Sequence, residues 1–125
     1  MIRLLLVEDQ EIVRRGLKTL LETKPDLRVV GEAGNGQQAI ELVEQLHATE
    51  QDPEVILMDI RMPEMDGIEA TRIIKTKLAQ IPVIVLTLYS EYKAAALAAG
   101  ANAFLIKGES VEQLLAVLLT AISTN

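Results

Sequence analysis

Residues Val55 to Asp59 read VILMD, four consecutive apolar residues that end at a carboxylate. A short apolar run of this kind is typical of a strand that is buried on both faces of a parallel sheet. Three further runs end in the same way at polar residues: Ile2–Val7 at Glu8 and Asp9, Val83–Leu86 at Thr87, and Phe104–Ile106 at Lys107. In open α/β sheets, ligands bind at the carboxyl ends of the strands. The four runs therefore predict one candidate site at a single edge of the sheet.

Helical patterns separate these runs. A fifth strand is expected over Leu27–Glu32, with Arg28 and Glu32 pointing outward as on an edge strand. Helices are expected over these segments: residues 11–23, 37–47, 67–78, 90–99 and 110–123. Ser90 is expected to cap the fourth helix, and Ser110 with Gln113 the fifth. Five strands that alternate with five helices predict a parallel sheet with right-handed crossovers and helices on both faces.

The composition excludes several classes of function. The chain has 125 residues, a length that fits one domain. Its net charge of −6 argues against nucleic-acid binding by this chain alone, because phosphate contacts need clustered Lys and Arg. The absence of cysteine removes thiolate catalysis and sulfur metal sites, and it fits a reducing cytoplasm. No apolar run is long enough to span a bilayer, so no membrane association is expected.

The residues at the strand ends carry a specific chemistry. Three carboxylates that meet at one edge repel one another unless a positive charge holds them together. Since the chain offers oxygen ligands and no cysteine, Mg²⁺ is the cation that fits best. Lys107 adds a charge suited to a phosphoryl oxygen, and Thr87 adds a hydroxyl that can donate or accept. A carboxylate nucleophile, a metal, a lysine and a hydroxyl are the parts needed for phosphoryl transfer to an aspartate.

At these residues the chain resembles the receiver domain of two-component response regulators. The resemblance spans the full length and rests on four segments: LLVED at residues 5–9, MDIRMPEMDG at 58–67, VLT at 85–87 and FLIKG at 104–108. RRGL at residues 14–17 and VGEA at 30–33 are most similar to the NarL/FixJ subgroup. The resemblance implies a flavodoxin-like fold, with five parallel strands in the order 2-1-3-4-5 and five flanking helices. It also implies that residues 1–125 form one receiver domain, with any output domain lying outside this chain.

The resemblance implies a role for each site residue. Asp59 would accept the phosphoryl group from a sensor histidine kinase or a small phosphodonor, and Lys107 and Thr87 would contact it. Mg²⁺ would be the only cofactor, and its ligands would be Asp9, Asp59, Glu8 through a water molecule, and the backbone carbonyl of Arg61. Thr87 and Phe104 would form the switch that moves the helix over residues 90–99. The domain would not be an enzyme beyond Mg²⁺-dependent self-phosphorylation and dephosphorylation.

Three residues near the predicted site set this chain apart. Leu88 follows Thr87 where the family usually has a small residue. Arg61 and Tyr89 occupy two rim positions that, in the family, influence hydrolysis of the acyl phosphate. We therefore predict narrowed access to the site and slow self-dephosphorylation.

The final helix is apolar on more than one side. From Val111 to Ile122, only Glu112, Gln113 and Thr120 are polar. Because packing on a sheet covers one side, a second surface is expected to bury the rest. A homodimer partner, through this helix or a neighbouring face, or a contiguous output domain would do so. The output domain would be a helix-turn-helix that binds DNA and regulates transcription.

Two alternatives remain open at this point. Residues 34–39, GNGQQA, match the dinucleotide fingerprint between a strand and a helix, as in a small flavodoxin-like enzyme that binds a dinucleotide or flavin. A plain turn is the favoured interpretation, because the motif follows the second strand, on a predicted edge. The other alternative is a stand-alone receiver that acts by protein contact. His47, the single histidine, is expected to be exposed.

Overall fold

The computed structural model describes residues 1–123. Within them, five strands form one parallel sheet in the order β2-β1-β3-β4-β5. The strands are β1 (Ile2–Val7), β2 (Leu27–Ala33), β3 (Val55–Met58), β4 (Val83–Thr87) and β5 (Ala103–Ile106). The helices are α1 (Glu11–Leu21), α2 (Gly36–Ala48), α3 (Gly67–Lys77), α4 (Lys93–Ala98) and α5 (Val111–Ser123), with a short 3-10 turn η1 (Ser90–Tyr92) before α4. The predicted fold class and strand order are confirmed.

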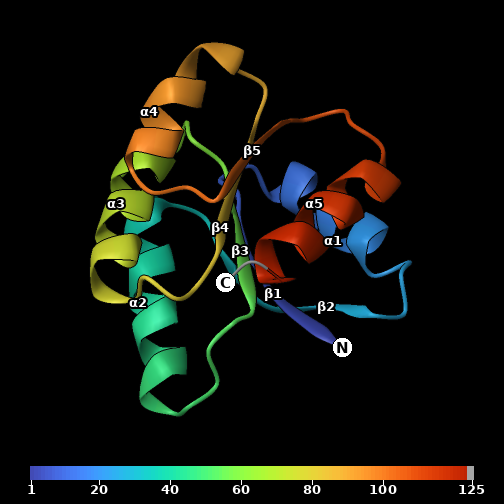
Figure 1. Ribbon diagram of the computed structural model, residues 1–125, viewed down its shortest axis with the longest axis horizontal. Coiled ribbons are helices and arrows are strands. Elements are labelled where there is room, and N and C mark those ends of the chain that lie inside the picture. Colours follow the sequence, from blue (N-terminus) through green and yellow to red (C-terminus); the bar gives the residue numbers. More distant parts are fainter. Residues whose placement is uncertain (124–125) are drawn as a thin grey trace.

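The helices form two layers around the sheet. Helices α1 and α5 lie on one side of it, and α2, α3 and α4 lie on the other (Figure 1). Side chains alternate along each strand, so Leu4 and Leu6 of β1 pack in the core under α1 and α5, whereas Leu5 and Val7 pack under α2 and α3. Both faces of β1 are therefore buried. This explains why the strand reads as a continuous apolar run.

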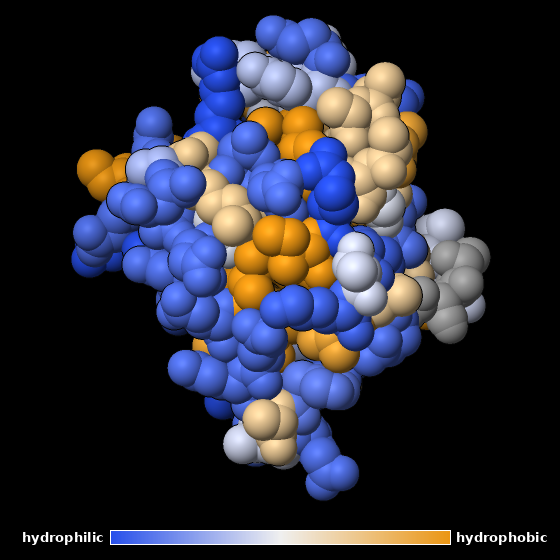
Figure 2. All heavy atoms as spheres, turned by 90° about the vertical axis from the view of Figure 1, so that its left-hand side faces the viewer, coloured by the Kyte–Doolittle hydropathy of each residue, from blue (hydrophilic) through white to orange (hydrophobic). Residues whose placement is uncertain are grey.

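The layer of α2, α3 and α4 presents a mainly polar surface. On this face, apolar side chains gather in a central strip between polar ones (Figure 2). Leu42 and Leu46 of α2 and Ile73 of α3 pack, partly buried, against the core beneath them. These helices are thus amphipathic and place their charged residues toward solvent.

The sheet register aligns the strand ends at one edge. Val7 of β1 lies opposite Met58 of β3, and Thr87 of β4 lies opposite Ile106 of β5. Asp59 N–H donates to the Val7 carbonyl over 3.0 Å, which extends the pairing of β1 and β3 by one residue. The strand order reverses between β1 and β3, the place where ligands bind in folds of this class.

Of the two predicted helix caps, one is confirmed and one is wrong. Ser110 Oγ accepts a hydrogen bond from Gln113 N–H over 3.1 Å, as expected at the start of α5. The prediction that Ser90 caps the fourth helix is wrong. Tyr89 is the extended residue that precedes the helical path, so Ser90 falls inside η1, and α4 begins only at Lys93. Gly100, with a φ of +106°, follows the end of this segment.

Helix α5 covers the sheet with more than one row of side chains. Leu114, Leu118 and Ala121 are buried, and Leu115, Val117 and Ile122 pack against the same core. Leu119 keeps 47% of its surface exposed. Part of the apolar surface of α5 therefore faces solvent, and its burial by another surface stays a prediction. In residues 1–123, no helix combines the length and the apolar character needed to cross a membrane.

Candidate functional site

Three carboxylates meet where β1 and β3 end. One oxygen from each of Glu8, Asp9 and Asp59 lies within 4.8 Å of the others. The fold holds two of them away from solvent: Glu8 is 2% exposed and Asp59 is 8% exposed. The prediction that these residues share one site is met in the geometry, because β1 and β3 are neighbours in the sheet although about 50 residues separate them in the chain.

Lys107 connects two of these carboxylates. The lysine follows β5, and its Nζ donates to Glu8 and, over 3.1 Å, to Asp59 Oδ2. The remaining oxygens are also bonded: Glu8 Oε2 accepts from Gln10 N–H over 3.1 Å, and Asp59 Oδ1 accepts from Ile60 N–H over 2.8 Å. Both buried carboxylates therefore have defined orientations.

The cluster carries more negative than positive charge. Burial raises the pKa of Asp59, Lys107 lowers it, and the charge of Glu8 raises it again, so that it lies above its ordinary value of 3.8. Burial and the neighbouring Glu8 likewise raise the pKa of Asp9. Burial also raises the pKa of Glu8, but hydrogen bonds from Lys107 and Gln10 bring it below its ordinary value of 4.5. Three carboxylates share one ammonium group, so a cation with two charges would balance the site.

Thr87 and Phe104 lie behind the carboxylates and not among them. Thr87 is fully buried at the end of β4, and its hydroxyl accepts a hydrogen bond from Tyr89 N–H over 3.4 Å. Phe104 is partly buried and packs against a small core that includes Ile60 and Ala96 of α4. Neither residue lines the pocket over the carboxylates, and of the two it is Phe104 that packs with a residue of α4.

A pocket of about 300 Å³ opens above the carboxylates. Its walls are formed by Glu8, Asp9, Gln10, Val13, Asp59, Arg61, Leu88, Tyr89 and Lys107. Leu88, which is 62% exposed, forms part of the wall, and the narrowing of access stays a prediction. The Arg61 guanidinium lies 4.4 Å from the centre of the Tyr89 ring, in a cation–π contact. Tyr89 in turn meets the edge of Tyr92 at 6.3 Å between ring centres.

Sequence reasoning missed three contributors to this region. Gln10 and Val13 line the pocket, and Arg14 donates to the backbone carbonyl of Glu8 over 2.6 Å. Gln10 could have been predicted from the sequence, because it directly follows the acidic pair Glu8 and Asp9. Arg14 gave no comparable signal, since an arginine on an amphipathic helix is usually a solvated charge.

The glycine turn does not form a phosphate cradle. Gly34 N–H donates to Gln38 Oε1 over 2.8 Å, Gly36 N–H to the Met65 carbonyl over 3.0 Å, and Gln38 N–H to Asn35 Oδ1 over 2.9 Å. A dinucleotide site needs such donors to face the ligand. The turn instead starts α2 and packs it against the loop before α3. His47 is half exposed, as predicted, and pairs with Asp52 at 2.8 Å.

Comparisons with known proteins agree on one family. The model of the response regulator receiver domain matches residues 4–119. The transcriptional regulatory protein LnrK of Bacillus subtilis is 37% identical over 122 residues, which cover 96% of this chain and 53% of LnrK. LiaR of the same organism is 44% identical over 109 residues, covering 86% of this chain and 49% of LiaR. The chain thus spans about half the length of these curated relatives.

A solved structure supports the same assignment. The signal receiver domain of the putative response regulator NarL from Mycobacterium tuberculosis superposes with a TM-score of 0.87 at 27% identity, covering 99% of this chain and 98% of that one. The predicted resemblance to the NarL-type subgroup is confirmed.

Proposed function

Because the chain belongs to the response regulator receiver domain family, we propose that it is a phosphorylation switch in which Asp59 accepts the phosphoryl group of a sensor histidine kinase. The observation that carries this proposal is the ion pair of Lys107 with Asp59, at 3.1 Å, inside a pocket of three carboxylates. The alternative of a dinucleotide- or flavin-binding enzyme is not favoured, because the donors of the glycine turn are already bonded within the chain.

The carboxylate cluster is suited to Mg²⁺. Its donors are hard oxygen atoms, two of them carried by buried side chains whose charges one lysine does not balance. Asp9 and Asp59 would bind the ion directly, Glu8 would act through water, and the carbonyl of Arg61, a residue that lines the pocket, would complete the protein ligands. When bound, Mg²⁺ neutralises the charge that develops on the transferring phosphoryl oxygens.

The chain's own residues carry the transfer. A carboxylate oxygen of Asp59 forms a bond to phosphorus while the bond from phosphorus to the histidine nitrogen of the kinase breaks. The electron pair of that bond stays on the nitrogen. Lys107 then exchanges its contact with Asp59 for one with a phosphoryl oxygen, so its charge remains compensated. With acetyl phosphate as the donor, acetate is the leaving group.

We assign the response to phosphorylation to Thr87 and Phe104. A phosphoryl group is a strong acceptor, which draws the Thr87 hydroxyl from Tyr89 N–H toward the pocket. Phe104, on the neighbouring strand β5, would respond to this movement, and it packs in the same small core as Ala96 of α4. The position of α4 is the expected readout.

We expect slow loss of the phosphoryl group. Leu88 and the Arg61–Tyr89 pair border the pocket through which a hydrolytic water must approach Asp59. An apolar side chain and a stacked pair limit the positions open to that water.

The length of the relatives suggests how the switch is used. LnrK and LiaR are transcriptional regulatory proteins about twice as long as the matched region. We propose that residues 1–125 form the receiver domain of a cytoplasmic regulator whose helix-turn-helix output domain binds DNA, and that α5 or a neighbouring face forms a homodimer. A stand-alone receiver is the second candidate. Sedimentation of a strict monomer in both phosphorylation states would remove the homodimer from this proposal.

Phosphorylation by a small donor tests the central claim. The chain is incubated with acetyl phosphate and Mg²⁺ and its intact mass is measured, with Asp59→Asn as the matched control. We expect one added phosphoryl group on the parent chain and none on the variant. An unmodified parent chain, or equal modification of the variant, would refute the proposal.

A further inference from the structure

The backbone of Glu8 is held by the edge strand β2 on its N–H side and by helix α1 on its carbonyl side. Glu8 N–H donates to the carbonyl of Ala33 over 3.0 Å, and the Glu8 carbonyl accepts from Arg14 Nη1 over 2.6 Å. A peptide group is planar, so fixing its carbonyl oxygen also fixes the direction in which the next residue leaves. The contact with Arg14 therefore fixes the direction in which the chain continues from Glu8 to Asp9.

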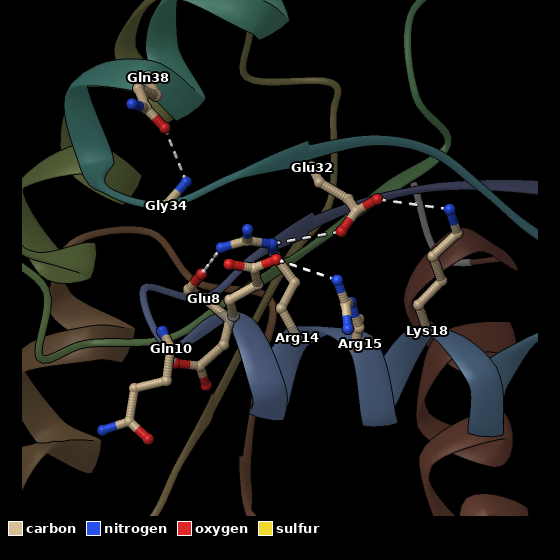
Figure 3. A network of polar contacts seen from close by, with 9 residues as sticks. Glu8, Gln10, Arg14, Arg15, Lys18, Glu32, Gly34 and Gln38 are labelled. Atoms are coloured by element: carbon tan, nitrogen blue, oxygen red, sulfur yellow. Dashed lines mark hydrogen bonds and ion pairs between the residues drawn. The ribbon is translucent and has the colours of Figure 1, made fainter.

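Arg14 is itself oriented by a carboxylate on β2. Its Nε donates to Glu32 Oε1 over 3.2 Å, while the other oxygen of Glu32 lies 3.4 Å from Lys18 Nζ. Figure 3 shows the guanidinium between the Glu8 carbonyl and Glu32, with Lys18 one helical turn farther along α1. Arg14 is only 20% exposed and Glu32 35% exposed, so solvent screens this pair less than a surface ion pair.

The shape of arginine suits this position. The guanidinium is a flat group with donors along several edges, so a single side chain can bond a carbonyl and a carboxylate in fixed directions. Lysine offers one compact ammonium group and no comparable plane. The neighbouring Arg15, by contrast, is 77% exposed and pairs with Glu11 on its own helix.

We propose that Arg14 is a positioning residue for the cation site, and that Glu32 acts on the site through Arg14. The inference rests on the proposed binding of Mg²⁺ to Asp9 and Asp59. Arg14 supports this binding by holding the Glu8–Asp9 peptide in the direction that brings the carboxylates together.

The charge of Arg14 and its hydrogen bond to the Glu8 carbonyl predict opposite effects of Arg14→Ala on the affinity for Mg²⁺. A cation near a carboxylate cluster repels Mg²⁺, so on charge alone Arg14→Ala would tighten binding of the ion. If the hydrogen bond to the Glu8 carbonyl is what matters, the same substitution weakens binding. The sign of the change separates the two explanations.

Titration calorimetry of the metal-free chain with MgCl₂, at physiological ionic strength, tests the proposal. We expect Arg14→Ala to raise the dissociation constant about tenfold, the lower end of the effect seen for groups that orient metal ligands. Arg14→Lys keeps the charge but should also weaken binding. Arg15→Ala, which removes the same charge from the next residue, should stay within about twofold of the parent chain.

A double-mutant cycle tests the role of Glu32. Glu32→Ala should weaken Mg²⁺ binding in the parent chain and have no further effect in the Arg14→Ala chain, because its action passes through Arg14. If Arg14→Ala does not fold, the effect of Glu32→Ala alone on Mg²⁺ binding still tests the proposal. Independent effects of the two substitutions would overturn the role of Glu32.

Initial phosphorylation by acetyl phosphate provides a second readout. At saturating Mg²⁺, Arg14→Ala should recover the rate of the parent chain, and only the Mg²⁺ concentration needed for half the maximal rate should rise. Equal or tighter Mg²⁺ binding by Arg14→Ala would overturn the proposal and leave the proposed function intact. A parent chain that binds no Mg²⁺ would overturn the proposed function and this inference with it.

Discussion

Lys107 Nζ lies 3.1 Å from Asp59 Oδ2 and also donates to Glu8, so one lysine pairs with both buried carboxylates of the pocket. In the metal-free protein, Lys107 carries the positive charge that these groups face. Lys107 does not neutralise the negative charge of the cluster, because Asp9 adds a third carboxylate to it.

Lys107→Ala should destabilise the metal-free chain. The substitution leaves Glu8, which is 2% exposed, without its cationic partner. Breaking a buried pair from one side costs about 3–5 kcal/mol, and the 16% exposure of the Lys107 side chain puts the expected loss near the lower value. Urea unfolding in EDTA and in MgCl₂ measures the effect. Mg²⁺ should recover more stability in the variant than in the parent chain, and an equal gain in both chains would contradict the prediction.

Asp59→Asn should stabilise the metal-free chain at neutral pH. The fold raises the pKa of Asp59, chiefly through burial, so its ionised form costs free energy in the folded state relative to the unfolded state. This cost is present above the raised pKa and disappears as the pH falls below the ordinary value of 3.8. The gain in the free energy of unfolding should therefore shrink as the pH is lowered. A gain that stays constant between neutral and acidic pH would show that ionisation is not its cause.

Leu88→Ala should hasten loss of the phosphoryl group. Removing this side chain widens the pocket wall beside Asp59 and admits water. We expect the half-life of the phosphorylated chain to fall severalfold, a change of about 1 kcal/mol in the barrier. Intact mass followed over time, in MgCl₂, provides the rate. Leu119→Ala is the matched control, because Leu119 is also an exposed leucine, at 47%, but lies on α5. Rapid loss in the parent chain that Leu88→Ala leaves unchanged would refute the role of Leu88.

Gly67→Ala should disrupt the segment that carries Asp59. A Cβ at this position would lie 1.7 Å from the backbone oxygen of Asp59, so α3 and the end of β3 must move apart. We expect a loss of at least about 3 kcal/mol in the free energy of unfolding, together with weaker phosphorylation.

The chain supplies a control for Gly67→Ala on another helix. At Gly16 of α1, an added Cβ would meet no atom within 4 Å. Gly16→Ala should therefore raise stability by about 0.5–1 kcal/mol through helix propensity alone. Chemical unfolding of both variants checks the pair, and similar effects would show that the contact at Gly67 is not decisive.

The sequence predicted the elements of this fold because burial leaves a local pattern. VILM at residues 55–58 is apolar throughout since both faces of β3 are covered, whereas Leu27–Ala33 alternates at the sheet edge. The polar residue after each run marked the site, because the strands are parallel and end at the same edge. The prediction of a cap at Ser90 was wrong, because a residue type that favours caps does not fix where a helix begins. Here Tyr89 is the cap residue, and Ser90 lies within η1.

What the sequence by itself determined, then, was the order of strands and helices and the kind of chemistry at Glu8, Asp9, Asp59 and Lys107. Both follow from properties of single residues and their near neighbours. Only the tertiary structure decided that Lys107 pairs with Glu8 across 99 positions of the chain, and that Arg14 joins the Glu8 carbonyl to Glu32. Such contacts depend on sheet register and on the direction of side chains from packed elements, which no local pattern encodes.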